Sequence, residues 1–189
     1  MKILKLLPGI ALSLLFLQTN AQEAPKGFGK GKVVLADNSV VNGFVKDNIR
    51  KDASVTLLVD GKEKKYNGAD IAAAEVDGSS YNCIKGDFFK VVCNGELTFL
   101  QKSSNASSKP TTIGNEVFFI SGTEGKPGDY FIYENKSRQL KLVSKKNLNT
   151  VVASSFEGYA PAIEKAKAAQ DDIAQLKDAV ETYNGRNGK

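Results

Sequence analysis

The stretch VVCNGELTF, residues 91–99, decides the fold class because it contains the strongest hairpin signal in the chain. Asn94-Gly95 stands between two β-rich runs, residues 91–92 and residues 97–99. Both central residues of a type I′ turn need a positive φ, and an Asn-Gly pair adopts that conformation most readily. The stretch therefore predicts two antiparallel strands joined by a type I′ turn.

Similar turn pairs on both sides of this hairpin divide residues 30–144 into short strands. They are Asp37-Asn38, Asp60-Gly61, Asp77-Gly78 and Gly86-Asp87. Between and beyond these pairs, residues 55–59 and 139–142 alternate in the period of a half-buried strand. Residues 117–120 are apolar on both faces and predict a central strand, and residues 130–133 predict another. We therefore expect an antiparallel β region over residues 30–144.

A polar segment interrupts this β region. Residues 103–115 are rich in Ser, Thr, Asn and Lys and contain Pro110, a composition typical of a mobile surface loop. The loop is either a binding loop or a tolerated insertion. Because it contains no aromatic and no acidic residue, its composition favours the insertion.

The period of the apolar residues changes to that of a helix after Lys145. A short helix is expected around residues 148–152, and a longer one over about residues 160–184. Pro161 suits the first turn of the longer helix, and Gly185 suits its C-terminal cap. One face of this helix carries an apolar stripe, which consists of Ile163, Ala166, Ile173, Leu176, Val180 and Tyr183.

The apolar stripe allows two interpretations. It either packs on the sheet, or it docks on a partner protein through Ile163, Ile173, Leu176 and Val180. A free amphipathic helix is only marginally stable in water, which favours packing. We therefore expect one α+β domain: an antiparallel sheet or small barrel with a hairpin extension, packed by a C-terminal helical region over residues 145–185, with a tail over residues 186–189.

The chain begins with the features of a secretory signal peptide, residues 1–21. Two lysines lie within the first five residues, an apolar run covers residues 10–17, and small Ala21 marks the exit. No Cys stands beside this cleavage site, which argues against a lipid anchor there. We expect the mature protein to be periplasmic or extracellular and to begin at Gln22, with a flexible lead-in over residues 22–29.

The length and the net charge of the mature protein limit the classes of protein to which it can belong. Removing 21 residues from the 189 of the chain leaves 168, enough for one domain with a hydrophobic core. Removing the two lysines of the leader from the 26 basic residues leaves 24 against 21 acidic residues, a net charge of +3. Because no basic block is interleaved with aromatic residues, we expect no nucleic-acid partner. No other apolar segment reaches the roughly 20 residues that cross a bilayer, so we expect no transmembrane segment after signal cleavage.

Several chemistries are excluded by composition. The chain has no His and two Cys, which excludes zinc sites and Ser-His or Cys-His nucleophile pairs. We expect no cofactor and no metal. A carboxylate-dependent hydrolase needs only two acids, and the candidates are Glu75, Asp77, Glu96 and Glu134. All four lie near strand ends or turns, where surface acids are common, and the chain has no Trp to stack on a sugar ring.

Cys83 and Cys93 leave two alternatives open. An exported protein encounters an oxidising compartment, which favours a disulfide. A tight hairpin at residues 85–87 would place Cys83 opposite about Phe89, and Cys93 would then lie about 13 Å further along the strand. A disulfide needs Cα atoms within about 7 Å, so this geometry favours two buried thiols that behave as small apolar groups.

The order of several short motifs extends over most of the mature chain. After the Ala21-Gln22 exit come a strand at residues 33–35 and a turn around Asp37, then Asn94-Gly95-Glu96-Leu97, and finally a helical end at Tyr183-Asn184. This order resembles a family of small secreted β-rich proteins of Bacteroidota-type bacteria that has no assigned activity. The resemblance implies a cell-envelope location and supplies no catalytic residues.

We therefore expect an exported cell-envelope protein with a non-enzymatic binding or scaffolding role. A carboxylate-dependent hydrolase and a helix-mediated interaction module are the two alternatives.

Overall fold

The structure is a computed structural model of the chain and describes residues 23–106, 110–113, 116–119 and 122–187. The predicted signal peptide and Gln22 lie outside the described residues. No helix in the described residues is long and apolar enough to cross a membrane.

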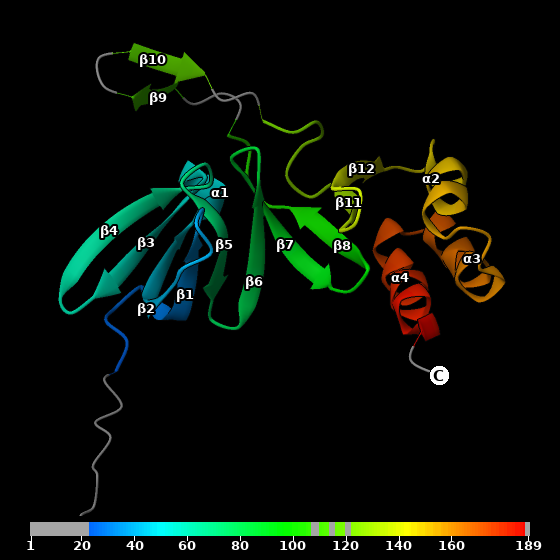
Figure 1. Cartoon of the computed structure of the whole chain (residues 1–189), viewed down its shortest axis with the longest axis horizontal. Helices are drawn as coiled ribbons and strands as arrows, with labels where there is room; N and C mark the ends of the chain where they lie inside the picture. The colour runs from blue at the N-terminus through cyan, green and yellow to red at the C-terminus, as the bar shows by residue number, and fades with distance from the viewer. Residues whose placement is uncertain (1–22, 107–109, 114–115, 120–121, 188–189) are drawn as a thin grey trace, which may run out of the picture.

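The fold consists of one large sheet, a separate hairpin and a group of short helices (Figure 1). The strands of the large sheet are β1 (Gly29–Leu35), β2 (Val40–Asn48), β3 (Ser54–Val59), β4 (Lys62–Asn67), β5 (Ile71–Val76), β6 (Ser79–Ile84), β7 (Asp87–Cys93), β8 (Leu97–Lys102), β11 (Tyr130–Glu134) and β12 (Gln139–Val143). The separate hairpin pairs β9 (Pro110–Ile113) with β10 (Glu116–Phe119). The helices are α1 (Ile49–Asp52), α2 (Leu148–Ser155), α3 (Ala160–Ala166) and α4 (Leu176–Asn184), with 3₁₀ turns η1 (Lys167–Gln170), η2 (Ile173–Gln175) and η3 (Gly185–Asn187).

The large sheet is open and antiparallel, with the strand order β12-β11-β8-β7-β6-β5-β1-β2-β3-β4. Its β4 end curls, so that Gly68 and Gly86 form an isolated antiparallel bridge. A Cβ on Gly68 would lie 2.2 Å from the carbonyl oxygen of Gly86, so this close approach requires glycine. Along their lengths, however, β4 and β6 do not pair. The predicted small barrel is therefore wrong, and β4 is an edge strand whose exposed lysines discourage further strand pairing.

Left-handed turns join neighbouring strands of the curled half. The φ angles are 49° and 74° at Asp60-Gly61, 47° and 74° at Asp77-Gly78, and 49° and 83° at Lys85-Gly86. Positive values at both positions define a type I′ turn, which matches the twist of the two strands that it joins. The hairpins expected at residues 60–61 and 77–78 are confirmed, and the third turn lies one residue before the expected Gly86-Asp87.

The Asn94-Gly95 connection joins β7 to β8 as expected, but the predicted type I′ conformation is wrong, because neither residue has a positive φ. Glycine is needed at position 95 for a different reason. A Cβ there would lie 2.3 Å from Nδ2 of Asn184, at the end of α4. The Asn184 side chain donates to the carbonyl oxygen of Leu97 at 2.8 Å and accepts from its N–H at 2.9 Å. The close approach of the C-terminal helix therefore leaves room only for glycine at this turn.

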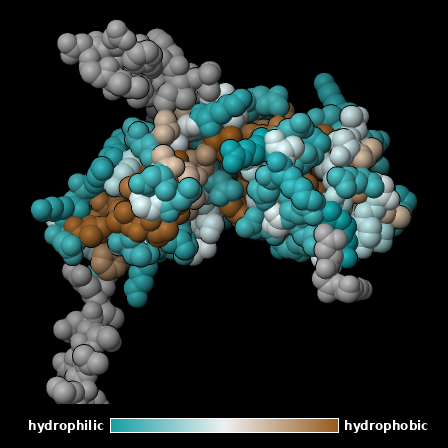
Figure 2. Space-filling view, in the orientation of Figure 1, coloured by the Kyte–Doolittle hydropathy of each residue, from teal (hydrophilic) through white to brown (hydrophobic). Residues whose placement is uncertain are grey.

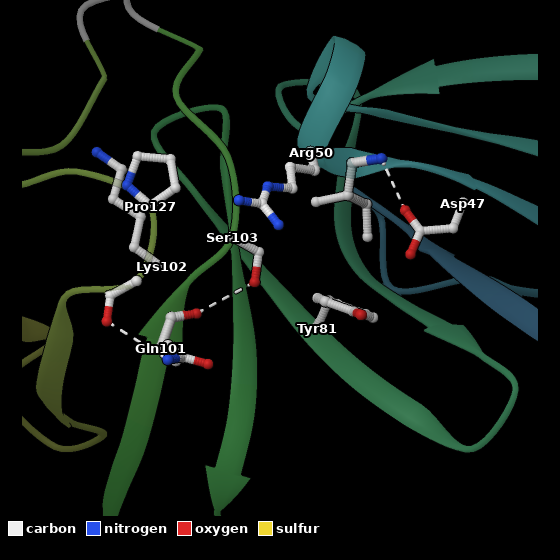
Figure 3. Close-up of a pocket in the computed structure, with 9 residues that line it drawn as sticks. Asp47, Arg50, Tyr81, Gln101, Lys102, Ser103 and Pro127 are labelled. Atoms are coloured by element: carbon white, nitrogen blue, oxygen red, sulfur yellow. Dashed lines mark hydrogen bonds between the residues drawn. The ribbon is translucent and has the colours of Figure 1, made fainter. Parts of the chain in front are cut away.

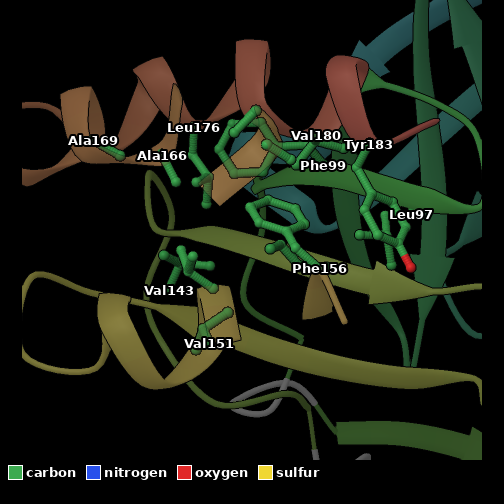
Figure 4. Packing of buried hydrophobic residues seen from close by; sticks show 14 of the residues in the cluster. Leu97, Phe99, Val143, Val151, Phe156, Ala166, Ala169, Leu176, Val180 and Tyr183 are labelled. Carbon is green, nitrogen blue, oxygen red and sulfur yellow. The ribbon is translucent and has the colours of Figure 1, made fainter. Parts of the chain in front are cut away.

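Two hydrophobic clusters give the two halves of the sheet separate cores. The first lies within the curl and includes fully buried Val33, Val45 and Val55. Figure 2 shows hydrophobic residues over this half of the molecule, whereas the helical end is mainly hydrophilic on the same face. The second cluster fills the space between β8, β11 and the helices (Figure 4). Its largest members include Phe99, Phe156, Leu176 and Tyr183.

The C-terminal region packs on the sheet, but the long helix expected over residues 160–184 is divided. Pro161 lies in the first turn of α3, as expected, and the helix at residues 148–155 is also confirmed. At Asp172 the backbone is extended, with φ −139°, and its side chain accepts from the Ala174 N–H at 3.0 Å. This cap starts a new helical segment. Gly185 is the C-cap of α4, as expected, with φ −76°, and the chain continues from it into η3.

The segment between β8 and β11 also differs from expectation. Residues 103–106 are not a free loop, because Ser104 is buried and its Oγ accepts from the Phe88 N–H at 2.8 Å. Part of the expected loop forms β9. The central strand expected over residues 117–120 is wrong as well, because β10 pairs with β9 in the separate hairpin, and residue 120 lies outside the described residues.

Candidate functional site

A polar hollow of about 340 Å³ lies where the curled half of the sheet meets the helical half (Figure 3). Its walls come from the end of β2 and α1, from β6, from the end of β8 and from the loop that precedes β11. The residues that line it are Asp47, Ile49, Arg50, Tyr81, Gln101, Lys102, Ser103, Pro127 and Gly128. Because these segments are distant in sequence, only the folded chain creates the hollow.

One wall of the hollow is held by a buried ion pair between Asp87 and Lys102. Their Oδ2 and Nζ atoms are 3.0 Å apart, and both side chains are 0% exposed. Nζ also donates to the carbonyl oxygens of Thr123, Glu124 and Gly125, at 2.8, 3.1 and 3.2 Å. An ammonium group has three donors. Contacts within the protein therefore occupy Lys102 fully, and it has no donor left for a ligand.

The Asp87 carboxylate accepts hydrogen bonds from the chain segments on both sides of the β9–β10 hairpin. Its Oδ1 accepts from the Ala106 N–H, before the hairpin. Its Oδ2 accepts from the N–H and the Oγ1 of Thr123, after the hairpin, at 2.8 and 2.7 Å. This buried network fixes the end of β8 and the loop before β11, which form one side of the hollow.

Arg50 supplies the free positive charge of the hollow. Its side chain is exposed, and among the described residues its guanidinium has no ion pair and no hydrogen-bond partner. Figure 3 shows this guanidinium directed toward Ser103 and away from Asp47. The Asp47 Oδ1 accepts from the Ile49 N–H at 2.8 Å. An unpaired guanidinium offers several N–H donors in one plane to an acceptor from outside the chain.

Tyr81 and Ser103 add neutral hydroxyl groups to the lining of the hollow. Burial, together with the negative charge of Asp47, raises the pKa of Tyr81, so its phenol stays protonated at neutral pH. The Ser103 Oγ donates only a long hydrogen bond, 3.3 Å, to the carbonyl oxygen of Gln101. The Gln101 Nε2 donates a long hydrogen bond, 3.4 Å, to the carbonyl oxygen of Gly128. The Ser103 and Gln101 donors of the hollow are therefore weakly used within the protein, whereas the Tyr81 hydroxyl is hydrogen-bonded to Ser79.

The carboxylates considered for hydrolysis fall into two places. Glu96 and Glu134 line one small hollow of about 160 Å³ next to Tyr183. Glu75 instead pairs with Lys32 at 3.0 Å on the curled half, and Asp77 occupies the β5–β6 turn. The structure thus brings together one pair of the four candidates.

Both acids of this pair are held in the ionised form. A hydrogen bond from Lys136, supported by Arg186, lowers the pKa of Glu96. Burial opposes ionisation of Glu134, but hydrogen bonds from Lys141 and Ser137 outweigh it and lower its pKa. A two-carboxylate hydrolase needs one acid whose pKa is raised so that it can donate a proton. Neither Glu96 nor Glu134 meets this requirement.

Two serines approach Lys141 in the same region. Its Nζ lies 3.1 Å from the Oγ of Ser154 and 3.4 Å from the Oγ of Ser155. Lys141 Nζ is also ion-paired with Glu134, so these contacts belong to a network of one carboxylate, one lysine and two serines rather than to an isolated serine–lysine pair.

The two cysteines are not joined in the structure. Cys83 faces Phe88 across the β6–β7 hairpin, and Cys93 faces Phe99 across the β7–β8 hairpin. Cys93 is five positions beyond Phe88, which corresponds to about 16 Å along a strand. Burial raises the pKa of the Cys83 thiol above its usual range and that of Cys93 to about 11, so both thiols are poor nucleophiles at neutral pH.

The residues considered for helix docking divide between the core and its border. Leu176 and Val180 are 0% exposed and belong to the cluster beneath the helices. Ile163 and Ile173 are partly buried against the same cluster. Leu176 and Val180 therefore cannot contact a partner while α4 is packed on the sheet.

The sequence contains little that singles out the residues of the hollow. Asp87 is marked only as part of a turn pair, and Lys102 follows an apolar strand. Arg50 and Tyr81 are marked by no local signal, and Ser103 is marked only as the first residue of the polar segment over residues 103–115. The hairpin register could have shown that the start of β7 and the end of β8 are close, but no local pattern places α1 against them.

Comparison with known proteins found no matching family model, no matching curated protein and no matching solved structure. Within the part of the chain that the structure describes, no group of three or more acidic, Cys or His side chains is arranged to hold a metal ion.

Proposed function

We propose that this protein is exported to the cell envelope and acts there as a non-enzymatic binding or scaffolding protein, with the hollow around Arg50 as its ligand site. One observation carries the binding part: the unpaired Arg50 guanidinium and the weakly bonded Ser103 hydroxyl face each other in one hollow whose wall is fixed by a buried ion pair. Binding sites commonly combine such a preformed hollow with a few converging polar groups. The export part rests on the charge, apolar run and small exit residue of residues 1–21.

The two alternatives are supported less well. The hydrolase alternative would use Glu96 and Glu134, whose lowered pKa values leave no proton donor. The helix-docking alternative would use Leu176 and Val180, which are already buried. The hollow around Arg50 needs no rearrangement before a ligand enters.

Export is tested by the N-terminus of the protein isolated from expressing cells. We expect mass spectrometry to find a chain that begins at Gln22, with or without cyclisation of that residue, in the periplasmic or extracellular fraction. A variant in which Leu14 and Leu15 are both replaced by Arg interrupts the apolar run and should remain uncleaved in the cytoplasm. Wild-type protein that retains Met1 and stays in the cytoplasm would contradict the export proposal.

Binding is tested on ¹⁵N-labelled residues 22–189 with a defined set of small envelope components: free amino acids, muropeptides and short glycans. We expect amide shifts for at least one component to concentrate at Arg50, Tyr81, Ser103 and Gly128. Ser103→Phe, which fills the hollow, should abolish these shifts without lowering the thermal midpoint by more than a few degrees. Because the substitution lies in a part-exposed position, its folding is checked first by the same spectrum.

The pattern of shifts also separates the alternatives. Shifts around Glu96 and Glu134 with appearance of a cleaved product would favour the hydrolase. Shifts confined to α3 and α4 on addition of a partner protein would favour helix docking. No shift at the hollow with any component would refute the binding proposal.

A further inference from the structure

Building on the proposed function, we propose that the hollow recognises a carboxylate group of its ligand and that Arg50 is the residue that binds it. A guanidinium forms two parallel N–H···O hydrogen bonds with a carboxylate, a geometry that a compact ammonium cannot reproduce.

The charges around the hollow favour an anion with a single negative charge. Arg50 and Lys102 are the two cations that line it, and Lys102 is fully occupied by Asp87 and three carbonyl oxygens. Arg50 is therefore the lining cation without an ion pair among the described residues, and its guanidinium is directed away from the Asp47 carboxylate (Figure 3). Asp47 contributes a nearby negative charge that opposes a second charge on the ligand. A carboxylate satisfies this balance better than a phosphate, which carries up to two negative charges at neutral pH.

The neighbours of Arg50 suit the rest of such a ligand. The Ser103 hydroxyl lies in the direction in which the guanidinium points (Figure 3). Its single O–H can exchange the long hydrogen bond to the Gln101 carbonyl oxygen for one to a carboxylate oxygen. The ring of Tyr81 and Pro127 provide apolar surface beside these donors. The combination fits a small carboxylate attached to a compact, partly apolar body.

The experiment compares matched charged and neutral probes by amide shifts and by calorimetry. One pair is N-acetylalanine and its amide, which represents a peptide carboxylate. The other is glucuronate and glucose, which represents a sugar carboxylate. Inorganic phosphate is the third probe. We expect the carboxylate of at least one pair to bind at least tenfold more tightly than its neutral partner and than phosphate, and the preferred pair identifies the source of the carboxylate.

Three variants test the role of Arg50. Arg50→Gln should weaken carboxylate binding about tenfold or more, since it removes a charge-assisted bidentate contact. Arg50→Lys should give an intermediate loss. Arg138→Gln removes the same charge from the exposed turn between β11 and β12 and should leave binding unchanged. Thermal midpoints of all three should match the wild type.

Two results with the carboxylate probes would overturn this inference. One is equal affinity of the hollow for a carboxylate and its neutral partner, and the other is unchanged affinity in Arg50→Gln. Either result would leave the proposed binding function intact, provided that some probe still shifts the amides of the hollow. Tighter binding of phosphate than of either carboxylate would show that the hollow prefers a different class of anion and would also refute the inference. Failure of every component of the envelope set and of every probe here would refute the proposed function itself.

Discussion

Deletion of residues 160–189 is expected to yield insoluble protein. The deleted segment contributes Leu176, Val180 and Tyr183 to the cluster that covers the helical half of the sheet, all of them at most 1% exposed. Without it, Phe99 and Ile132 would become exposed to water on β8 and β11. Large exposed apolar patches promote aggregation. The measurement is the soluble fraction of residues 22–159 beside that of residues 22–189, expressed in parallel.

Leu176→Ala tests the packing of the same C-terminal helices without removing them. Truncation of a fully buried Leu typically reduces the free energy of unfolding by about 2–5 kcal/mol. For a chain of this size that corresponds to a fall of about 4–20 °C in the thermal midpoint. The control is the adjacent Lys177→Ala, which removes an exposed side chain paired with Glu181 at 3.6 Å and should change stability by less than about 1 kcal/mol. A soluble 22–159 fragment that melts cooperatively would show that the helices do not complete the core.

Asp87→Asn is expected to be the most destabilising of the conservative substitutions. It keeps the size of the side chain but leaves the Lys102 ammonium buried without its counter-charge, and it turns an acceptor of the Thr123 contacts into a donor. Removal of one partner of a buried ion pair typically reduces the free energy of unfolding by about 3–5 kcal/mol. Urea unfolding monitored by circular dichroism measures the change.

Two further variants show whether burial is the cause. Glu75→Gln breaks the pair with Lys32, whose side chains are 34% and 44% exposed, and should reduce stability by less than about 1 kcal/mol. The double variant Asp87→Asn/Lys102→Met removes the uncompensated charge as well and should recover part of the loss. Equal effects of Asp87→Asn and Glu75→Gln would contradict a dominant role for the buried pair.

The ion pair also connects the fold to the candidate site. Asp87 and Lys102 hold the end of β8 and residues 123–125, which are adjacent to Ser103 and Pro127 in the wall of the hollow. Loss of the pair should therefore disturb binding as well as stability. The Arg50 guanidinium, by contrast, forms no ion pair and no hydrogen bond among the described residues, so its substitution should change binding alone. The two positions separate a structural role from a recognition role.

Local sequence patterns determined the strands and many of the turns. Alternation of polar and apolar residues predicted β3 and β12, and Asp60-Gly61 and Asp77-Gly78 form left-handed turns where they were expected. These features are local because a period of two residues and a preference for positive φ act within a few residues. The helix at residues 148–155 and the start of α3 at Pro161 follow from equally local rules.

Tertiary structure decided how these elements are arranged. The sheet stays open because the curl brings β4 only to a single bridge at Gly68 and Gly86, a property of accumulated strand twist rather than of any one strand. Gly95 is required by the approach of Asn184 and not by its own turn. The extended backbone at Asp172 divides a stripe that is continuous in sequence.

The candidate site is also decided by the tertiary structure. Arg50, Tyr81 and Ser103 come from α1, β6 and the end of β8, and they meet because β7 and β8 extend the sheet beyond the curl. The chain contains the charged and hydroxyl groups in its sequence, but their convergence depends on strand order, register and the buried Asp87–Lys102 pair. Periodicity and turn preference act over short stretches of chain, so they could define the elements and could not bring these distant side chains into one hollow.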